Sequence, residues 1–107
     1  MPAWNMAELT DRDIRDAGLD DWQHSESGLR ARYLTKSFMK GLGFVTAVAE
    51  AAEEANHHPD VVLTYPHVEL TLISHDVGKI TDRDIKLARR ITQIAESSGI
   101  AAAAAGE

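Results

Sequence analysis

The sequence predicts an α+β domain in which helices pack on one face of a four-stranded antiparallel sheet. Two observations support this class. Segments that alternate polar and apolar residues occur in two pairs, and only a short turn interrupts each pair, as is typical of hairpins. Segments with helical periodicity lie before, between and after these pairs. The expected order is therefore α-β-β-α-β-β-α.

One domain accounts for the chain. It has 107 residues, of which 44% are hydrophobic and 26% are charged. This length suits a single compact domain, and the composition is too apolar for general disorder and too interrupted by charge for a membrane span. We expect the domain to cover residues 1–100, and the alanine-rich residues 101–107 to form a flexible tail.

The first predicted elements are a short helix and a hairpin. Thr10 can cap a helix over residues 11–17, and Gly18 is a natural stop for it. Residues 22–25 and 29–34 have the pattern of two strands joined by a short turn. The second of these strands alternates apolar and basic side chains, in the order Leu29, Arg30, Ala31, Arg32 and Tyr33.

The central helix has the strongest periodic signal. Ser37 can act as its N-cap. Apolar residues then recur in steps of three and four: Phe38, Leu42, Val45, Val48, Ala49, Ala52 and Ala55. These steps place one apolar stripe on a helix that ends near Asn56, because Pro59 favours extended geometry for the residue before it. Gly41 and Gly43 would allow another element, including a partner helix, to approach this helix closely.

A second hairpin and a last helix complete the order. Residues 60–64 are a predicted strand, and a Tyr-Pro turn separates it from a second strand that ends near His75. The last helix starts at Thr81 and carries apolar residues on one face. Gly99, followed by Ile100, is a typical helix stop with a hydrophobic return contact.

The composition excludes several classes of function. Cysteine is absent, which rules out disulfide scaffolds, thiol nucleophiles and cysteine-ligated zinc. Lys and Arg number 11 and Asp and Glu 17, so the formal net charge is -6, which argues against a nucleic-acid partner. The first residues lack the basic start and apolar run of a signal peptide, so we expect a cytoplasmic protein without a membrane partner.

Three of the five histidines occupy positions that favour chemistry. His57 and His58 precede Pro59 at a helix-to-strand corner, and His75 lies where a strand runs out into a loop. Because imidazole has an ordinary pKa of about 6.5, such side chains can both donate and accept protons near neutrality. The remaining two, His24 and His67, are interpreted as surface residues.

A zinc site is the main alternative for these histidines, since imidazole is a common zinc ligand. Neighbouring residues in extended geometry point to opposite sides, so His57 and His58 cannot easily bind one ion. The chain also has no His-x-His or His-x-x-x-His pair. We therefore expect a site without metal, in which imidazoles act as general acids and bases.

Two carboxylates near the histidines have alternative interpretations. Glu53 lies one helical turn before His57, where it can hydrogen-bond an imidazole or remain a solvated helix residue. Asp84 is the third residue after Thr81, where an acid caps a helix. The same Thr-Asp-Arg-Asp-Ile string occurs at residues 10–14, so the string can be purely a capping device. A supporting role at the histidine site remains the alternative for both residues.

A pattern of fixed gaps connects these residues. Glu53-x-x-x-His57-His58-Pro59 is followed after five residues by Tyr65, after nine more by His75, and after eight more by Asp84. This pattern resembles the signature of the pterin-4a-carbinolamine dehydratases, also called 4a-hydroxytetrahydropterin dehydratases. The resemblance extends from about Leu9 to Ala95. It implies a hydro-lyase that needs no metal or organic cofactor. Such an enzyme dehydrates 4a-hydroxytetrahydrobiopterin to the quinonoid dihydropterin and so recycles the pterin of aromatic amino-acid hydroxylases.

The resemblance also implies roles for individual residues. His57, His58 and His75 correspond to the active-site histidines of the family. His57 and His75 would transfer protons, one acting on the departing hydroxyl and one on the ring-nitrogen proton, while His58 would bind and orient the pterin. The wall of the pterin pocket would comprise His57, His58, Pro59, Ser74, His75, Asp76 and Val77.

A binding function is the alternative to an enzyme. Relatives with this fold serve as dimerisation cofactors of transcription factors or as assembly factors for a large carboxylase. The intact histidine set favours the enzyme, because a scaffold gains nothing from two imidazoles before a proline. Edge strands of a four-stranded sheet tend to pair with neighbours, and members of the family are dimers or tetramers. We therefore expect a homodimer or homotetramer with a sheet continuous between subunits.

Overall fold

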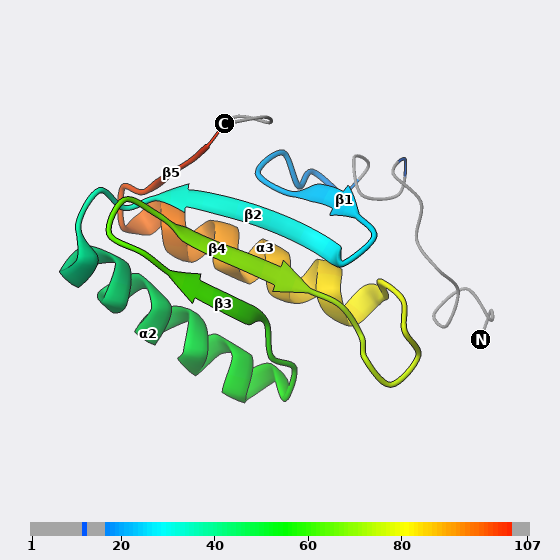
Figure 1. The fold of residues 1–107 in the computed structure, drawn as a ribbon. Helices are drawn as coiled ribbons and strands as arrows, with labels where there is room; N and C mark the ends of the chain where they lie inside the picture. The colour runs from blue at the N-terminus through cyan, green and yellow to red at the C-terminus, as the bar shows by residue number, and fades with distance from the viewer. Residues whose placement is uncertain (1–11, 13–16, 104–107) are drawn as a thin grey trace.

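The computed structural model describes residue 12 and residues 17–103. The elements, in chain order, are β1 (Gln23–Ser25), β2 (Gly28–Leu34), α2 (Phe38–Ala55), β3 (Asp60–Leu63), β4 (Val68–Leu72), α3 (Asp82–Ser97) and β5 (Ala101–Ala102) (Figure 1). From β1 onward this order confirms the predicted α+β class. The helix predicted over residues 11–17 lies almost entirely outside the described residues.

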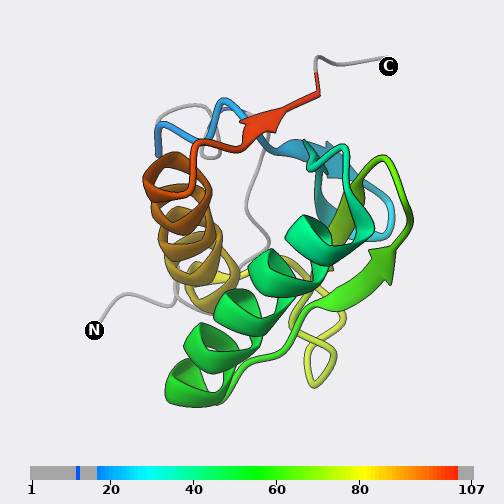
Figure 2. The ribbon, with the colours of Figure 1, turned by 90° about the vertical axis from the view of Figure 1, so that its left-hand side faces the viewer.

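The sheet consists of two hairpins placed side by side. Its strand order is β1-β2-β4-β3, and all its pairs are antiparallel. Helices α2 and α3 lie on one face of the sheet, and no other described element covers the opposite face (Figure 2). The cross-strand pairs between β2 and β4 on the covered face are apolar: Leu29 with Leu72, Ala31 with Leu70, and Tyr33 with Val68. The two-residue alternation of the sequence therefore places every second side chain in the core.

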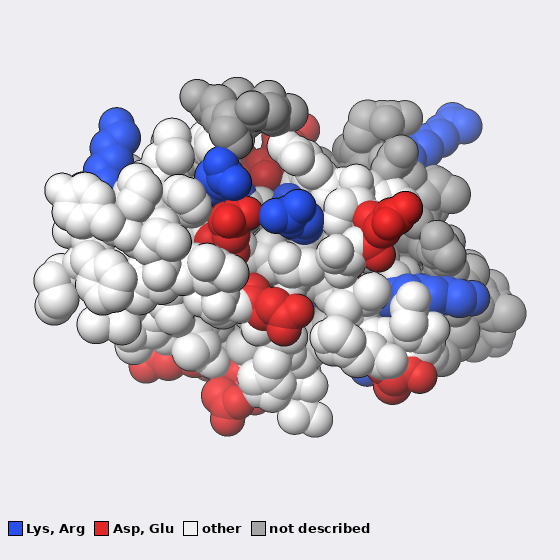
Figure 3. All heavy atoms as spheres, viewed as in Figure 1, with Lys and Arg blue, Asp and Glu red and all other residues white. Residues whose placement is uncertain are grey.

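The open face of the sheet carries charges of both signs. Arg30 and Arg32 approach the Glu69 carboxylate to 3.0 and 3.4 Å from the neighbouring strand. Partial burial alone would raise the pKa of Glu69, but the hydrogen bond and positive charge of Arg32, together with Arg30, hold it below its ordinary value. Figure 3 shows blue and red side chains next to one another over the centre of this face. Such intermixed charge is typical of a solvated surface.

A short fifth strand, formed by residues 101–102, adds to the predicted four strands of the sheet. After α3 the chain turns at Gly99, whose φ is 69°, and Ile100 returns into the core. Ala101 and Ala102 then pair with Leu34 and Tyr33 of β2, and the Ala103 N–H donates to the Arg32 carbonyl at 2.7 Å. The hydrophobic anchor at Ile100 thus holds the first alanines of the segment at 101–107 against the sheet.

Strand β4 ends at Leu72, earlier than the predicted end near His75. Ser74 forms only an isolated bridge with Lys79, and its carbonyl accepts from the N–H groups of Val77 and Gly78 at 3.1 and 2.8 Å. These bonds close a tight turn, in which Gly78 has a φ of 67°. Local turn bonds therefore replace the strand ladder before His75.

An aromatic cluster joins the first hairpin to both helices. Tyr33 is fully buried, and its ring lies 6.4 Å from Trp22 and 5.2 Å from Phe44 between centroids. The Tyr33 hydroxyl donates to Asp21 at 3.1 Å, and the Trp22 indole N–H donates to the Thr92 hydroxyl at 3.0 Å. Burial raises the pKa of Tyr33 well above its ordinary value. The cluster therefore keeps its polar atoms paired inside the core.

Helix α2 ends just before the corner that carries His57 and His58, which we call the histidine corner. Ser37 caps it by accepting from the Lys40 N–H at 3.2 Å, and Asn56 ends it in the left-handed conformation with a φ of 51°. Gly41 packs inside the chain, since a Cβ there would lie 2.7 Å from the Leu63 side chain. Gly41 therefore allows α2 to approach the sheet rather than a partner helix, whereas a Cβ at Gly43 would meet no described atom within 4 Å beyond its own stretch of helix. Within the described residues, neither helix is long and apolar enough to cross a membrane.

Candidate active site at the end of strand β4

Four segments meet at one end of the sheet. Asp60 at the start of β3 pairs with Thr71 near the end of β4, so the corner after α2 lies beside the turn that follows β4. Helix α3 begins directly after that turn (Figure 1). The pairing register therefore brings residues 57–59 and 74–84 to the same end of the fold, although they are separate in sequence.

A buried hydrogen bond joins His57 to Asp84. The distance from the His57 Nε2 to the Asp84 Oδ1 is 2.5 Å, and the exposed fractions of the two side chains are 9% and 0%. The other oxygen of Asp84, Oδ2, accepts from the Thr81 N–H and from the Ser74 hydroxyl, both at 2.8 Å. The hydroxyls of Ser74 and Thr81 lie 2.7 Å apart. The side-chain oxygens of Ser74, Thr81 and Asp84 therefore all have partners, as buried groups require.

This arrangement determines which ring nitrogen of His57 has no partner among the described residues. The Ser74 hydroxyl and the Thr81 N–H both donate to Oδ2, and hydrogen bonds donated to a carboxyl group favour its ionised form, which has no proton to donate. His57 must then donate from its Nε2, which leaves its Nδ1 as the nitrogen that can exchange a proton with another molecule. Asp84 makes both of the contacts considered for it, since it caps α3 and also hydrogen-bonds the His57 imidazole.

His58 forms a second, exposed pair with Glu53. The His58 Nε2 lies 2.5 Å from the Glu53 Oε2, with exposed fractions of 54% and 75%. Of the alternatives for Glu53, the structure therefore supports hydrogen bonding to an imidazole, although to His58 and in contact with solvent. The pair borders a cavity of about 330 Å³, whose lining is mainly apolar: Val45, Val48, Ala49, Ala52, Glu53, His58, Pro59 and Val61.

His75 lies on the exposed turn after β4. Its side chain has no hydrogen bond or ion pair within the described part of the chain. The next residue, Asp76, is paired with Arg83 at 2.7 Å, and the hydrogen bond and charge of Arg83 hold the pKa of Asp76 below its ordinary value. The side chains of the predicted wall thus differ: Ser74 is fully buried, Val77 is half-buried and Asp76 is exposed.

The structure therefore links some predicted site residues and separates others. Asp84 connects the His57 corner to the Ser74 segment, while His58 and Glu53 form their own pair. Thr81 joins the buried cluster, which the sequence indicated only as a helix cap. No group of three or more His, Asp or Glu side chains among the residues described could hold a metal ion.

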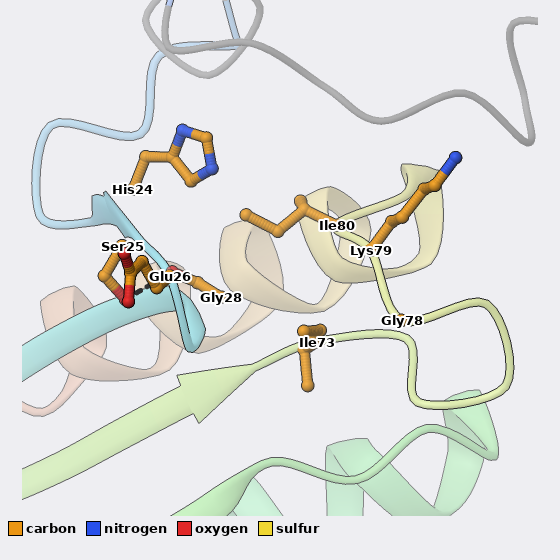
Figure 4. Close-up of a pocket in the computed structure, with 8 residues that line it drawn as sticks. All are labelled: His24, Ser25, Glu26, Gly28, Ile73, Gly78, Lys79 and Ile80. Carbon is orange, nitrogen blue, oxygen red and sulfur yellow. Dashed lines mark hydrogen bonds between the residues drawn. The ribbon is translucent and has the colours of Figure 1, made fainter.

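A second cavity lies on the other side of the turn after β4. Its volume is about 480 Å³, and it lies between the β1–β2 hairpin and the connection from β4 to α3 (Figure 4). Its lining comprises His24, Ser25, Glu26, Gly28, Ile73, Gly78, Lys79 and Ile80. None of the predicted site residues lines it. His24, interpreted from the sequence as a plain surface residue, therefore borders a cavity.

Comparisons with known proteins show which family the sequence resembles. The family model for pterin 4 alpha carbinolamine dehydratase matches residues 7–94. A Thermomicrobium roseum protein, provisionally assigned as a pterin-4-alpha-carbinolamine dehydratase, is 41% identical over 92 residues, which cover 84% of this chain and 99% of the relative. A Mycobacterium bovis protein with the same provisional assignment is 44% identical over 89 residues, covering 80% and 94%.

A solved structure supports the same relationship. The crystal structure of a transcriptional coactivator/pterin dehydratase from Brucella melitensis superposes with a TM-score of 0.75 at 32% identity. The match covers 83% of this chain and 99% of the Brucella chain. With a family model that spans most of the sequence and relatives above 40% identity, the chain belongs to the pterin 4 alpha carbinolamine dehydratase family.

Proposed function

We propose that the protein dehydrates 4a-hydroxytetrahydrobiopterin, a pterin-4a-carbinolamine, to the quinonoid dihydropterin by histidine acid–base catalysis. The observation that carries this proposal is the buried His57–Asp84 pair, which leaves the His57 Nδ1 free for proton transfer. The product, once reduced, would serve an aromatic amino-acid hydroxylase again. The resemblance of the motif to the family signature supplies the identity of the substrate.

The reaction needs two proton transfers and no change of oxidation state. The bond between C4a and its hydroxyl oxygen breaks, and the oxygen leaves as water after it receives a proton from an acid. The proton on the ring nitrogen N5 passes to a base, and the N5 electron pair forms the double bond to C4a. Positioned acids and bases each contribute about 10²- to 10⁴-fold in rate, so two imidazoles can account for such a step.

In this proposal one of His57 and His75 gives a proton to the leaving hydroxyl, and the other takes the proton from N5. His57 is fixed by Asp84, and His75 is carried by the turn that begins at Ser74, itself bonded to the same carboxylate. The common anchor supports a role for both segments at one substrate. His58 would bind the pterin with Glu53 behind it, next to the apolar cavity of about 330 Å³.

The rest of the predicted wall would contact the pterin in different ways. Pro59 borders the apolar cavity and would offer its ring face to the heterocycle. The Ser74 side chain is fully buried, so its part in the wall would come from its backbone. His75, Asp76 and Val77 belong to the turn, where backbone N–H and carbonyl groups can reach the polar edge of a pterin.

The direct test is the rate of dehydration of the 4a-hydroxytetrahydropterin above its spontaneous rate. We expect the protein to accelerate it, and His57→Ala and His75→Ala each to remove about 10²-fold or more of the acceleration. His67→Ala is the matched control, because His67 lies before β4, at the opposite end of the strand from the site. A wild-type protein without acceleration would exclude the enzyme.

A protein-binding role is the second candidate. The Brucella structure is described as a transcriptional coactivator/pterin dehydratase, and exposed apolar side chains gather where α2 begins. Phe38, Met39 and Leu42 are between 42% and 72% exposed on this helix. The end of the molecule where α2 begins is largely uncharged in Figure 3. Such a patch favours contact with another protein surface.

The exposed edge strand β3 supports a homodimer or homotetramer. Val61 and Val62 of the edge strand β3 are 40% and 52% exposed, and β3 pairs only with β4 within the described residues. An open apolar edge can continue the sheet into a second copy. Light scattering at micromolar concentration tests this, with Val62→Lys expected to shift the protein toward monomer. A wild-type protein that is purely monomeric would contradict it.

A further inference from the structure

The cluster beneath His57 is closed to solvent. The exposed fraction of Ser74 and Asp84 is 0%, and that of Thr81 is 3%. Each of the three residues bonds to the other two through a side chain or a backbone amide. The hydrogen bonds of this cluster are therefore made among its own members, and their donors follow from what each side chain can donate or accept.

The donors can be assigned in order from the carboxylate. Asp84 accepts only, so the proton of the Ser74 hydroxyl points to the Asp84 Oδ2. A hydroxyl has one proton, so in the 2.7 Å contact between the two hydroxyls Thr81 must donate to Ser74. The chain of donors therefore runs from Thr81 through Ser74 to Asp84, while the other oxygen of Asp84 faces His57.

We propose that Ser74 is a positioning residue, whose hydroxyl fixes the Asp84 carboxylate and through it keeps the proton of His57 on Nε2. Its consequence for turnover rests on the proposed dehydratase function, whereas its consequence for the His57 tautomer does not. Two bonds hold the Asp84 Oδ2, from Ser74 and from the Thr81 N–H, and they define the plane of the carboxylate. Loss of the Ser74 bond leaves Oδ2 with the Thr81 N–H alone, which weakens the restraint on the terminal torsion of Asp84, a torsion that is soft in Asp.

Ser74 also sets the backbone on which His75 stands. Its N–H donates to the Lys79 carbonyl at 3.0 Å, and its carbonyl accepts from Gly78 at 2.8 Å. One residue thus connects both proposed proton-transfer groups: its side chain acts on His57 through Asp84, and its backbone closes the turn that carries His75. The resemblance to the family had placed Ser74 in the wall of the pocket, and its burial gives its side chain a different role.

A purely structural cap is the competing explanation. In that case the hydroxyl of Ser74 would stabilise the start of α3 and leave the state of the imidazole unchanged. Replacement of Ser74 would then lower the stability of the fold, with no effect on the protonated nitrogen of His57. The two explanations therefore differ in a spectroscopic quantity that does not depend on turnover.

The test compares His57 in Ser74→Ala with His57 in the wild type by long-range ¹H–¹⁵N correlation spectra of the imidazoles. We expect the wild type to show the pattern of the Nε2–H tautomer, and Ser74→Ala to lose this single pattern. Ser74→Cys replaces the hydroxyl with a weak donor of similar shape and should behave in the same way. Ser74→Thr keeps a hydroxyl and should retain the pattern.

Ser37→Ala is the matched control. This replacement also removes a structural hydrogen bond, the one that the Lys40 N–H donates to Ser37, but Ser37 lies at the opposite end of α2 from His57. We expect the control to lose stability while its His57 pattern stays that of the wild type. If Ser74→Ala does not fold, Ser74→Cys and Ser74→Thr still separate the two explanations.

Turnover provides the second readout. We expect kcat to fall about tenfold in Ser74→Ala, with little change in KM, because loss of a hydrogen bond to a charged group has this effect. In an Asp84→Asn background the same replacement should add no further loss, since Ser74 acts through the carboxylate. If the wild type lacks activity, the tautomer measurement alone decides. An unchanged Nε2–H pattern in Ser74→Ala and Ser74→Cys overturns the proposal, whatever happens to kcat.

Discussion

The Asp84 carboxylate accepts a hydrogen bond from the His57 Nε2, 27 positions earlier in the chain, and also accepts the Thr81 N–H that opens the helix carrying it. One side chain therefore performs two tasks. As a cap it satisfies a backbone donor at the start of α3, and as a partner it orients an imidazole at the end of α2. The start of α3 and the histidine corner are in this way fixed relative to one another.

Replacement of Asp84 by Asn should affect activity and stability together. The amide has one acceptor and one donor end, so it must place its NH₂ group against either His57 or the donors from Ser74 and Thr81. We expect kcat to fall at least about 10²-fold, because the imidazole can then adopt the wrong tautomer. We also expect the free energy of unfolding to fall by roughly 2–4 kcal/mol.

The control for this prediction is Asp82→Asn in the same helical turn. Asp82 is 43% exposed, and its partner is Lys86 at 3.2 Å across one helical turn. Such an exposed pair contributes at most about 0.5 kcal/mol, so this variant should keep both activity and stability close to those of the wild type. Dehydration assays and urea unfolding measure the two quantities. Equal losses in both variants would assign the effect to charge at the start of α3.

The exposed pair of His58 and Glu53 should respond differently. If His58 binds the pterin, His58→Ala should raise KM several-fold more than it lowers kcat, and Glu53→Gln should do so more weakly. Since both side chains are more than half exposed, the free energy of unfolding should change by less than about 0.5 kcal/mol. Glu54→Gln, at the next position on the same helix, provides the control. A large loss of kcat in His58→Ala with constant KM would instead make His58 a proton-transfer group.

Local signals in the sequence were sufficient to predict most elements. Ser37 and the apolar stripe after it predicted α2, because a cap and a helical period are properties of neighbouring residues. The two-residue alternation in β2 and β4 predicted which side chains enter the core. Strand β5 could not be predicted in this way, since it depends on a pairing with β2, which lies far earlier in the chain. The end of β4 differed from the prediction because Ser74 bonds within a local turn, which the strand alternation does not indicate.

The site was predicted only in part, for the same reason. The positions of His57, His58 and His75 beside corners indicated a functional end of the fold. The sequence could not distinguish a capping Asp84 from one that holds an imidazole, because the identical string at residues 10–14 has the same local pattern. The difference lies in the partner that the tertiary structure supplies, which for Asp84 is His57.

The burial of Tyr33 leads us to predict that the stability of the fold falls with pH in the alkaline range. Burial raises the pKa of Tyr33 in the folded protein above the value of about 10 expected for an unfolded chain. The neutral phenol therefore stabilises the fold fully below pH of about 10, and this contribution is lost as the pH rises through the folded pKa. At neutral pH, Tyr33→Phe should be less stable by about 1 kcal/mol, because it lacks the hydrogen bond to Asp21.

The two proteins should become more alike as the pH rises. Tyr33→Phe has no phenol to ionise at this position, so its free energy of unfolding should fall less steeply above pH of about 10. Urea unfolding at pH 7 and at several values up to pH 11 measures the difference. Tyr65→Phe is the control, since Tyr65 is 68% exposed. The free energy of unfolding of this variant should follow that of the wild type at every pH. Parallel curves for Tyr33→Phe and the wild type would show that Tyr33 does not titrate differently in the two states.

Substitution by alanine should change the free energy of unfolding in opposite directions at two glycines. Gly28, in the first hairpin, has a φ of 125°, and a Cβ there would lie 2.2 Å from the Leu72 carbonyl oxygen on β4. Gly28→Ala should therefore lower the free energy of unfolding by more than about 2 kcal/mol, since the positive φ disfavours alanine and its Cβ would clash with the neighbouring strand. Gly43 lies within α2, where a Cβ meets nothing within 4 Å, so Gly43→Ala should gain about 0.5–1 kcal/mol. Urea unfolding of both variants checks this. A neutral Gly28→Ala would mean that the hairpin can move away from Leu72, and the cavity between that hairpin and the connection after β4 would then change shape.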